Sequence, residues 1–219
     1  MHILELEMLT NDLYKTEKFY RDILGLRVAG KSGSRMSFLA GNTTLIFRHT
    51  SSHQPLYHIA FNIPNNKLDE ALDWMRARVE ILDATPGHKI ADFVNWNAKS
   101  FYFYDSCGNI LELIVRFDLD NNSTTPFNGS SIICVSEIGI AIDDVSLECD
   151  ALVTNYNMPV FSKQPRLPNF TVLGDHHGLI ILSSVNRHWH PTDRPAQKCH
   201  TKIAINNNNQ IHSLSFYTN

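Results

Sequence analysis

Residues 101–115 read FYFYDSCGNILELIV, two strongly apolar runs on either side of a turn-forming segment at residues 105–109. Gly108 and Asn109 tolerate positive φ, so this stretch predicts a β-hairpin. Its second strand contains one charged residue, Glu112, between two leucines. A carboxylate in an apolar strand is costly to bury unless a metal, a cation or the water of an open groove compensates it. Glu112 is therefore the first candidate functional residue.

The composition is that of an ordinary globular protein and excludes several functional classes. The chain has 219 residues, 43% of them hydrophobic and 19% charged, with a formal net charge of −3. This charge is too small to indicate nucleic-acid binding, and the sequence has no run of Lys and Arg. No apolar stretch approaches the ~20 residues of a membrane span, so we expect a cytoplasmic protein. The four cysteines form no C-x-x-C pair and predict neither a zinc knuckle nor a disulfide framework.

The first half of the chain repeats one structural unit, a strand, a helix and further strands. In the first unit these are expected at residues 2–9, 12–24, 34–40 and 43–49, with a short extra strand near 26–29. Asn11 or Asp12 can cap the helix, and Gly25 ends it. The second unit has a strand at 56–63, a helix after residues 64–66 and the closing hairpin.

The second half repeats the pattern incompletely. Residues 119–131 are polar and predict a linker. A third unit follows, with elements expected at 132–142, 144–156, 169–174 and 179–185, and a fourth is reduced to two strands near 198–205 and 211–217. We therefore predict a complete two-module domain at residues 1–118 and a truncated domain of the same type at 132–219.

Three separated motifs now agree in order and spacing. They are FYRDILG at residues 19–25, LYHIAF at 56–61 and the closing hairpin. Together they resemble the vicinal oxygen chelate superfamily, which includes glyoxalase I, extradiol ring-cleaving dioxygenases, fosfomycin-resistance enzymes and bleomycin-resistance proteins. The resemblance implies an α+β fold of paired βαβββ modules, whose curved mixed sheets form open barrels with the helices outside. It also implies that the two halves pack as an internal pseudo-dimer, with homodimerisation left open.

The resemblance implies a metal site as well. At the family's ligand positions this chain has Glu5, His58 and Glu112. Glu7, on the same strand face as Glu5, is a candidate general base or alternative ligand. One imidazole and two carboxylates suit a divalent ion such as Mn²⁺, Fe²⁺, Zn²⁺ or Ni²⁺ and leave open positions for two substrate oxygens. The set lacks the fourth ligand of glyoxalases and the second histidine of iron dioxygenases, which makes oxygen chemistry less favoured.

Two functional hypotheses follow. The first is a metal-dependent enzyme acting on a small oxygen-rich molecule, by lyase or isomerase chemistry or by ring-cleaving dioxygenation. The alternative is a metal-free protein of the bleomycin-resistance type that binds a small molecule in the same groove. In the second half, Glu137, His200 and His212 stand at positions corresponding to Glu5, His58 and Glu112. A second site there is conceivable, but we favour a degenerate half that shapes the pocket of the first.

Overall fold

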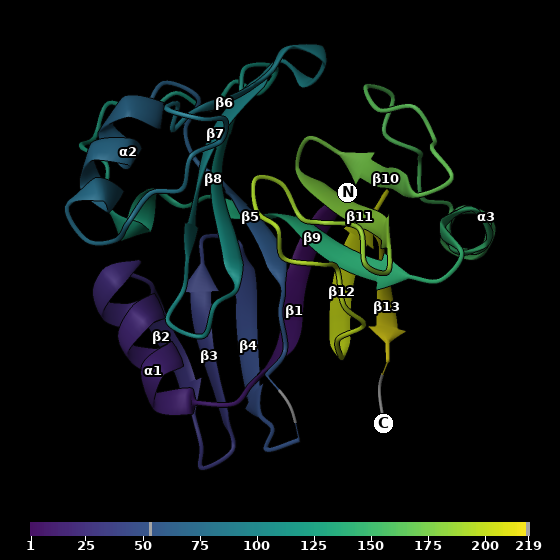
Figure 1. The fold of residues 1–219 in the computed structure, drawn as a ribbon, viewed down its shortest axis with the longest axis horizontal. Helices are drawn as coiled ribbons and strands as arrows, with labels where there is room; N and C mark the ends of the chain where they lie inside the picture. The colour runs from purple at the N-terminus through teal and green to yellow at the C-terminus, as the bar shows by residue number, and fades with distance from the viewer. Residues whose placement is uncertain (53, 218–219) are drawn as a thin grey trace.

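The molecule contains more strand than helix, and the helices lie on its outside (Figure 1). The structure is a computed structural model, and it describes residues 1–52 and 54–217. The strands are β1 (His2–Thr10), β2 (Arg27–Lys31), β3 (Arg35–Ala40), β4 (Thr43–His49), β5 (His58–Asn62), β6 (Ala91–Phe93), β7 (Ala98–Tyr104), β8 (Ile110–Arg116), β9 (Cys134–Ile142), β10 (Phe170–Asp175), β11 (Gly178–Ser184), β12 (Thr201–Asn207) and β13 (Gln210–Phe216). The helices are α1 (Leu13–Lys18), α2 (Leu68–Arg76) and α3 (Val145–Tyr156), with a π-helical turn η1 (Phe19–Ile23) and the 3₁₀ turns η2 (Val94–Trp96) and η3 (Gly129–Ser131).

The predicted closing hairpin is confirmed as β7 and β8. Tyr102 pairs with Glu112 across it, and Phe103 pairs with Leu111. The turn is fixed by Asp105, whose carboxylate accepts hydrogen bonds from the backbone N–H of Cys107 at 2.8 Å and of Asn109 at 2.9 Å. These bonds fix the register of the two strands and therefore the face on which Glu112 lies.

The first helix begins and ends where the sequence predicts. The Asp12 side chain accepts a hydrogen bond from the backbone N–H of Lys15 at 2.9 Å, which is an N-cap. Gly25 follows the π-helical turn with φ of +70°, a conformation that favours glycine. On the inner side, Tyr20 is fully buried against Phe38 and Phe47. The helix therefore packs on its own module through the FY motif.

The strands form two mixed sheets, and each sheet combines modules from both halves of the chain. The order is β13-β12-β1-β4-β3-β2 in one sheet and β10-β11-β9-β5-β8-β7-β6 in the other. The first two modules have the same internal order, β1-β4-β3-β2 and β5-β8-β7-β6, whereas the third contributes three strands and the fourth two. The α+β fold of paired modules with a truncated second half is thus confirmed. The domain division at residues 118 and 132 stays a prediction, since both sheets cross it.

The two sheets are joined by buried polar contacts as well as by a shared apolar core. The Tyr57 hydroxyl accepts a hydrogen bond from the backbone N–H of Leu9 at 3.0 Å and donates one to the carbonyl of His200 at 2.7 Å. This side chain therefore ties the segment before β5 to β1 and to the residue before β12. Within the described ranges, none of the helices has the length and apolarity to cross a membrane.

Candidate metal centre

A cavity of about 210 Å³ lies against the second sheet. Its walls are mainly aromatic and come from several elements and loops: Phe93, Trp96, Tyr102, Phe170 and Trp189. Three potential metal ligands stand together at the cavity: His58, Glu112 and Glu137. A cavity of apolar walls with a few convergent polar groups is the usual form of a small-molecule site.

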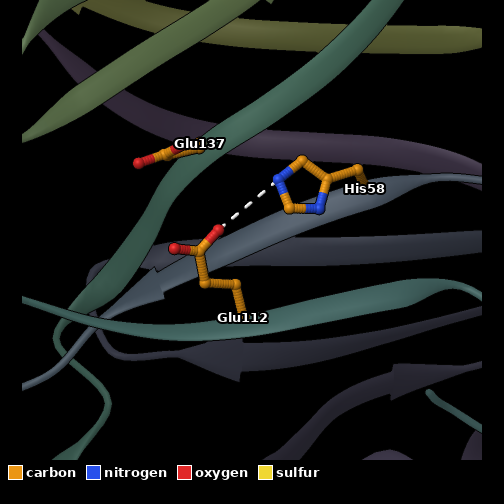
Figure 2. Close-up of side chains that lie close together, drawn as sticks. All are labelled: His58, Glu112 and Glu137. Atoms are coloured by element: carbon orange, nitrogen blue, oxygen red, sulfur yellow. Dashed lines mark ion pairs between the residues drawn. The ribbon is translucent and has the colours of Figure 1, made fainter. Parts of the chain in front are cut away.

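Strand register brings these three side chains together. Ala60 on β5 pairs with Glu112 on β8 and with Glu137 on β9, so the two carboxylates flank it on one face. His58 precedes Ala60 by two residues and therefore lies on the same face. One ligand atom from each residue lies within 4.8 Å of the others, and Figure 2 shows the His58 ring facing the Glu112 carboxylate, with Glu137 beside them. Within residues 1–52 and 54–217 this is the one cluster of potential metal ligands with such spacing.

The cluster is enclosed, and enclosure changes the acidity of its members. His58 Nε2 lies 3.5 Å from Glu112 Oε2, and all three residues are at most 6% exposed. Burial lowers the pKa of His58 to about 4, so its imidazole is neutral at pH 7 and its ring nitrogen can act as a ligand. Burial, followed by the charge of Glu137, raises the pKa of Glu112 to about 8. Burial also raises the pKa of Glu137, against the opposing effect of Arg116.

Arg116 is the counter-ion of the cluster. Its side chain is completely buried, and its Nη2 forms a close ion pair with Glu137 Oε1. Its Nε donates a hydrogen bond to Asn62 Oδ1 at 3.2 Å, which holds the guanidinium in place. With both carboxylates ionised and His58 neutral, the cluster has two negative charges, and Arg116 reduces the total to one. One imidazole and two carboxylates in a buried site fit a divalent cation, which would remove the remaining repulsion between the carboxylates.

Known proteins share sequence features and the fold of this chain. The sequence profile described as Glyoxalase/Bleomycin resistance protein/Dioxygenase superfamily matches residues 2–113, half of the chain. The chain belongs to this superfamily. Members of the superfamily bind small-molecule substrates. Comparison with curated protein sequences gives no match.

One solved structure shares this fold over most of the chain, and others align with about half of it. A Bacillus subtilis protein provisionally named as a dioxygenase aligns over 91% of this chain and 68% of its own, with 15% identity and a TM-score of 0.63. Lactoylglutathione lyase from Agrobacterium tumefaciens aligns over 52% of this chain and 92% of its own, with 23% identity and a TM-score of 0.43. The fosfomycin resistance protein FosX from Listeria monocytogenes, solved with Mn(II) and sulfate, aligns over 53% of this chain and 88% of its own, with 24% identity and a TM-score of 0.41.

Within this superfamily fold, the structure brings together two of the three ligands expected from the sequence and separates the third. His58 and Glu112 meet, whereas Glu5 is exposed on β1 in the other sheet, where it pairs with Thr44 and Ala204. The expected convergence of Glu5 with His58 and Glu112 is therefore wrong, and Glu137 is the carboxylate that stands beside them. The physical reason is strand pairing, because β5 is hydrogen-bonded to β9 and β1 to β12.

Glu7, the expected general base, also lies away from the cluster. It is on β1, with Oε1 3.3 Å from His200 Nε2 and 3.6 Å from Arg48 Nε. His212 is on β13, where its ring contacts Tyr156. The residues considered for a second site, Glu137, His200 and His212, are thus in three different surroundings and form no second cluster among the described residues.

The first sheet nevertheless retains the layout of the site without its ligands. Glu5 pairs with Ala204 as Glu137 pairs with Ala60, and Ala204 pairs on its other side with Ser213. Lys202, two residues before Ala204, has the place that His58 has in the second sheet. Glu5, Lys202 and Ser213 line a separate shallow cavity. A lysine and a serine thus replace a histidine and a glutamate, and the layout no longer supplies a metal set.

Sequence reasoning missed the tryptophan and arginine that complete the site. Trp189 lies over His58, with ring centroids 5.3 Å apart, and it approaches β9 closely because residue 139 is glycine. A Cβ at Gly139 would lie 2.5 Å from the Trp189 ring. Arg116 could have been noticed as an ionisable residue at the end of an apolar strand, but its pairing with Glu137 depends on β9 and has no local sequence pattern.

Proposed function

We propose that the chain is a metal-dependent enzyme of the glyoxalase/dioxygenase type, in which His58, Glu112 and Glu137 hold one divalent ion. The observation that supports it most strongly is the convergence of one buried imidazole and two buried carboxylates at the cavity. Mn²⁺, Fe²⁺, Ni²⁺ and Zn²⁺ all accept this ligand set. When bound, such an ion supplies Lewis-acid chemistry at two oxygens of a small substrate.

The chain's own residues have defined tasks in this proposal. His58 is held neutral by burial and keeps a lone pair for the ion. Glu112 must lose its proton before it can act as a ligand, because its pKa is raised to about 8. Arg116 orients Glu137 through their ion pair. The aromatic walls exclude water and offer flat surfaces to an apolar substrate body.

The alternative function is metal-free binding of a small molecule in the same cavity. The aromatic lining, with Trp189 and Tyr102 beside His58, favours this alternative as much as it favours an enzyme. The two functions differ in one respect, since only the enzyme needs the three side chains to hold an ion.

The test is metal-dependent turnover with matched variants. The protein, purified without chelator, is analysed for bound elements, reconstituted with each of the four ions and assayed with hemithioacetal and catechol substrates. We expect metal near one ion per chain and turnover that Glu112→Gln abolishes, while the control Glu5→Gln leaves both unchanged. A site that takes up none of the ions would overturn the enzyme proposal and favour the binding protein.

A further inference from the structure

Arg187 stands at the cavity wall with a guanidinium that has no protein counter-ion among the described residues. It lies three residues beyond β11 and lines the same cavity as the metal cluster. Its backbone is fixed in the loop, because its N–H bonds to the Ser184 carbonyl at 3.1 Å and its carbonyl accepts from the Ala196 N–H at 2.8 Å. The side chain lies over Phe170, with 4.4 Å between the guanidinium carbon and the ring centroid.

Three other arginines, of differing burial, have partners that Arg187 lacks. Arg116 pairs with Glu137, Arg166 donates to the Asp150 carboxylate at 2.7 Å, and Arg194 donates to the Gly108 carbonyl. No carboxylate within residues 1–52 and 54–217 forms an ion pair with Arg187. Burial lowers the pKa of Arg187, yet an arginine stays protonated at neutral pH. A guanidinium at a cavity wall with no protein anion is free to pair with an anionic group of a ligand.

Neither carboxylate at the cavity forms an ion pair with Arg187. The cavity-lining carboxylates are Glu112 and Glu137, the first beside His58 and the second paired with Arg116. The positive charge of Arg187 acts on His190 instead. Burial is the main cause that lowers the pKa of His190, and Arg187 lowers it further. The cavity is therefore anionic at the cluster and cationic at Arg187, with aromatic walls between.

We propose that Arg187 binds an anionic group, most simply a carboxylate, on a substrate with a single aromatic ring. Arginine is suited to this task because its planar fork donates two parallel hydrogen bonds to a carboxylate. The cavity volume of about 210 Å³ is below the roughly 300–1,000 Å³ usual for ligand sites, which suits one ring rather than a fused system. The orientation, with the ring oxygens at the metal cluster, rests on the proposed function; the recognition of the anion does not.

The test compares an anionic and a neutral probe, 3,4-dihydroxybenzoate and its methyl ester, which differ in charge and by one methyl group. Binding is followed by the fluorescence of Trp96 and Trp189, both of which line the cavity, with and without added Zn²⁺. We expect the wild-type protein to bind the acid at least ~10-fold more tightly than the ester. Arg187→Met should remove this preference by weakening the acid alone, and Arg187→Lys should keep part of it. The control Arg166→Met changes an arginine outside the cavity and should leave the preference intact.

The outcomes separate this proposal from the proposed function. An acid-to-ester preference that is the same in the wild type and in Arg187→Met would overturn the role of Arg187. Absence of binding for both probes at millimolar concentration would overturn the aromatic substrate class. A preference that depends on Arg187, together with affinities that Zn²⁺ strengthens for neither probe, would support anion recognition while contradicting the metal-dependent enzyme.

Discussion

Arg116 contacts the Glu137 carboxylate from the enclosed side of the cluster, and none of its side chain reaches solvent. A set of two carboxylates and one imidazole would by itself leave a bound divalent ion with no net charge. The guanidinium restores one positive charge, which is the net charge of a site with two imidazoles and one carboxylate. Glu137 and Arg116 thus act together as one neutral unit beside His58 and Glu112.

A double-mutant cycle tests this unit. Glu137→His alone places a neutral ligand beside an unpaired buried cation, so we expect Mn²⁺ affinity to fall by at least ~10-fold. Glu137→His combined with Arg116→Met restores the original net charge and should recover most of the loss. Isothermal titration provides the dissociation constants for all members of the cycle. Equal affinity in the single and the double variant would show that Arg116 has no electrostatic role.

Arg116→Met alone should destabilise the metal-free protein. Removing one partner of a buried ion pair leaves an uncompensated carboxylate and costs about 3–5 kcal/mol. Added metal binds only the folded state and should recover part of that loss. Urea unfolding with and without Mn²⁺ measures both effects. An unchanged free energy of unfolding in the metal-free variant would contradict the buried pair.

The acidity of Glu112 predicts a pH dependence of stability. In the folded protein its pKa is about 8, against a model-peptide value of 4.5, so folding favours the protonated form. This contribution is fully present below about pH 4.5 and is lost as the pH rises toward 8. Glu112→Gln cannot ionise, so the metal-free variant should become more stable than the wild type as the pH rises, by on the order of 2–4 kcal/mol at pH 8. Denaturant unfolding at intervals from pH 5 to pH 8 measures the difference, and a difference that is constant with pH would contradict the assignment.

The close approach of Trp189 to β9 predicts the effect of a single methyl group. Gly139→Ala would place a Cβ at 2.5 Å from the Trp189 ring and must displace it from His58. We expect a loss of about 1–3 kcal/mol in stability, typical of overpacking, and a weaker fluorescence response to cavity ligands. The control Gly33→Ala adds a methyl group that meets nothing within 4 Å and should be nearly neutral. Equal thermal stability of the two variants would contradict this packing.

The layout retained in the first sheet predicts that a second site can be restored there. Lys202→His with Ser213→Glu would place an imidazole and a carboxylate beside Glu5, at the places of the first site. We expect equilibrium dialysis with Zn²⁺ to show two bound ions per chain instead of one. Adding Glu5→Gln to this variant should remove the second ion only. Unchanged stoichiometry would mean that the two sheets differ in more than side-chain identity.

Much of the fold could be predicted from local sequence, because local patterns fix local structure. The hairpin around Asp105, the N-cap at Asp12 and the repeated modules all depend on neighbouring residues. In contrast, the choice of the strand that lies beside the second module does not depend on neighbouring residues. β1 and β9 have equivalent patterns, so the sequence alone leaves open whether Glu5 or Glu137 joins His58.

The same limit explains the missing counter-ion. Arg116 and Glu137 are 21 residues apart and meet through a strand pairing between modules. The site residues within one module, His58 and Glu112, were accessible to sequence reasoning because β5 and β8 belong to a recurring unit. Contacts between modules could be identified only from the structure.

The most direct test of the account compares Mn²⁺ binding by Glu137→Gln and Glu5→Gln. Electron paramagnetic resonance of free Mn²⁺ measures the dissociation constant and stoichiometry of each variant against the wild type, and circular dichroism confirms that both are folded. If His58, Glu112 and Glu137 hold the ion, Glu137→Gln will weaken binding by at least ~10-fold, and Glu5→Gln will bind like the wild type. Loss of binding in Glu5→Gln with normal binding in Glu137→Gln would contradict the proposed centre.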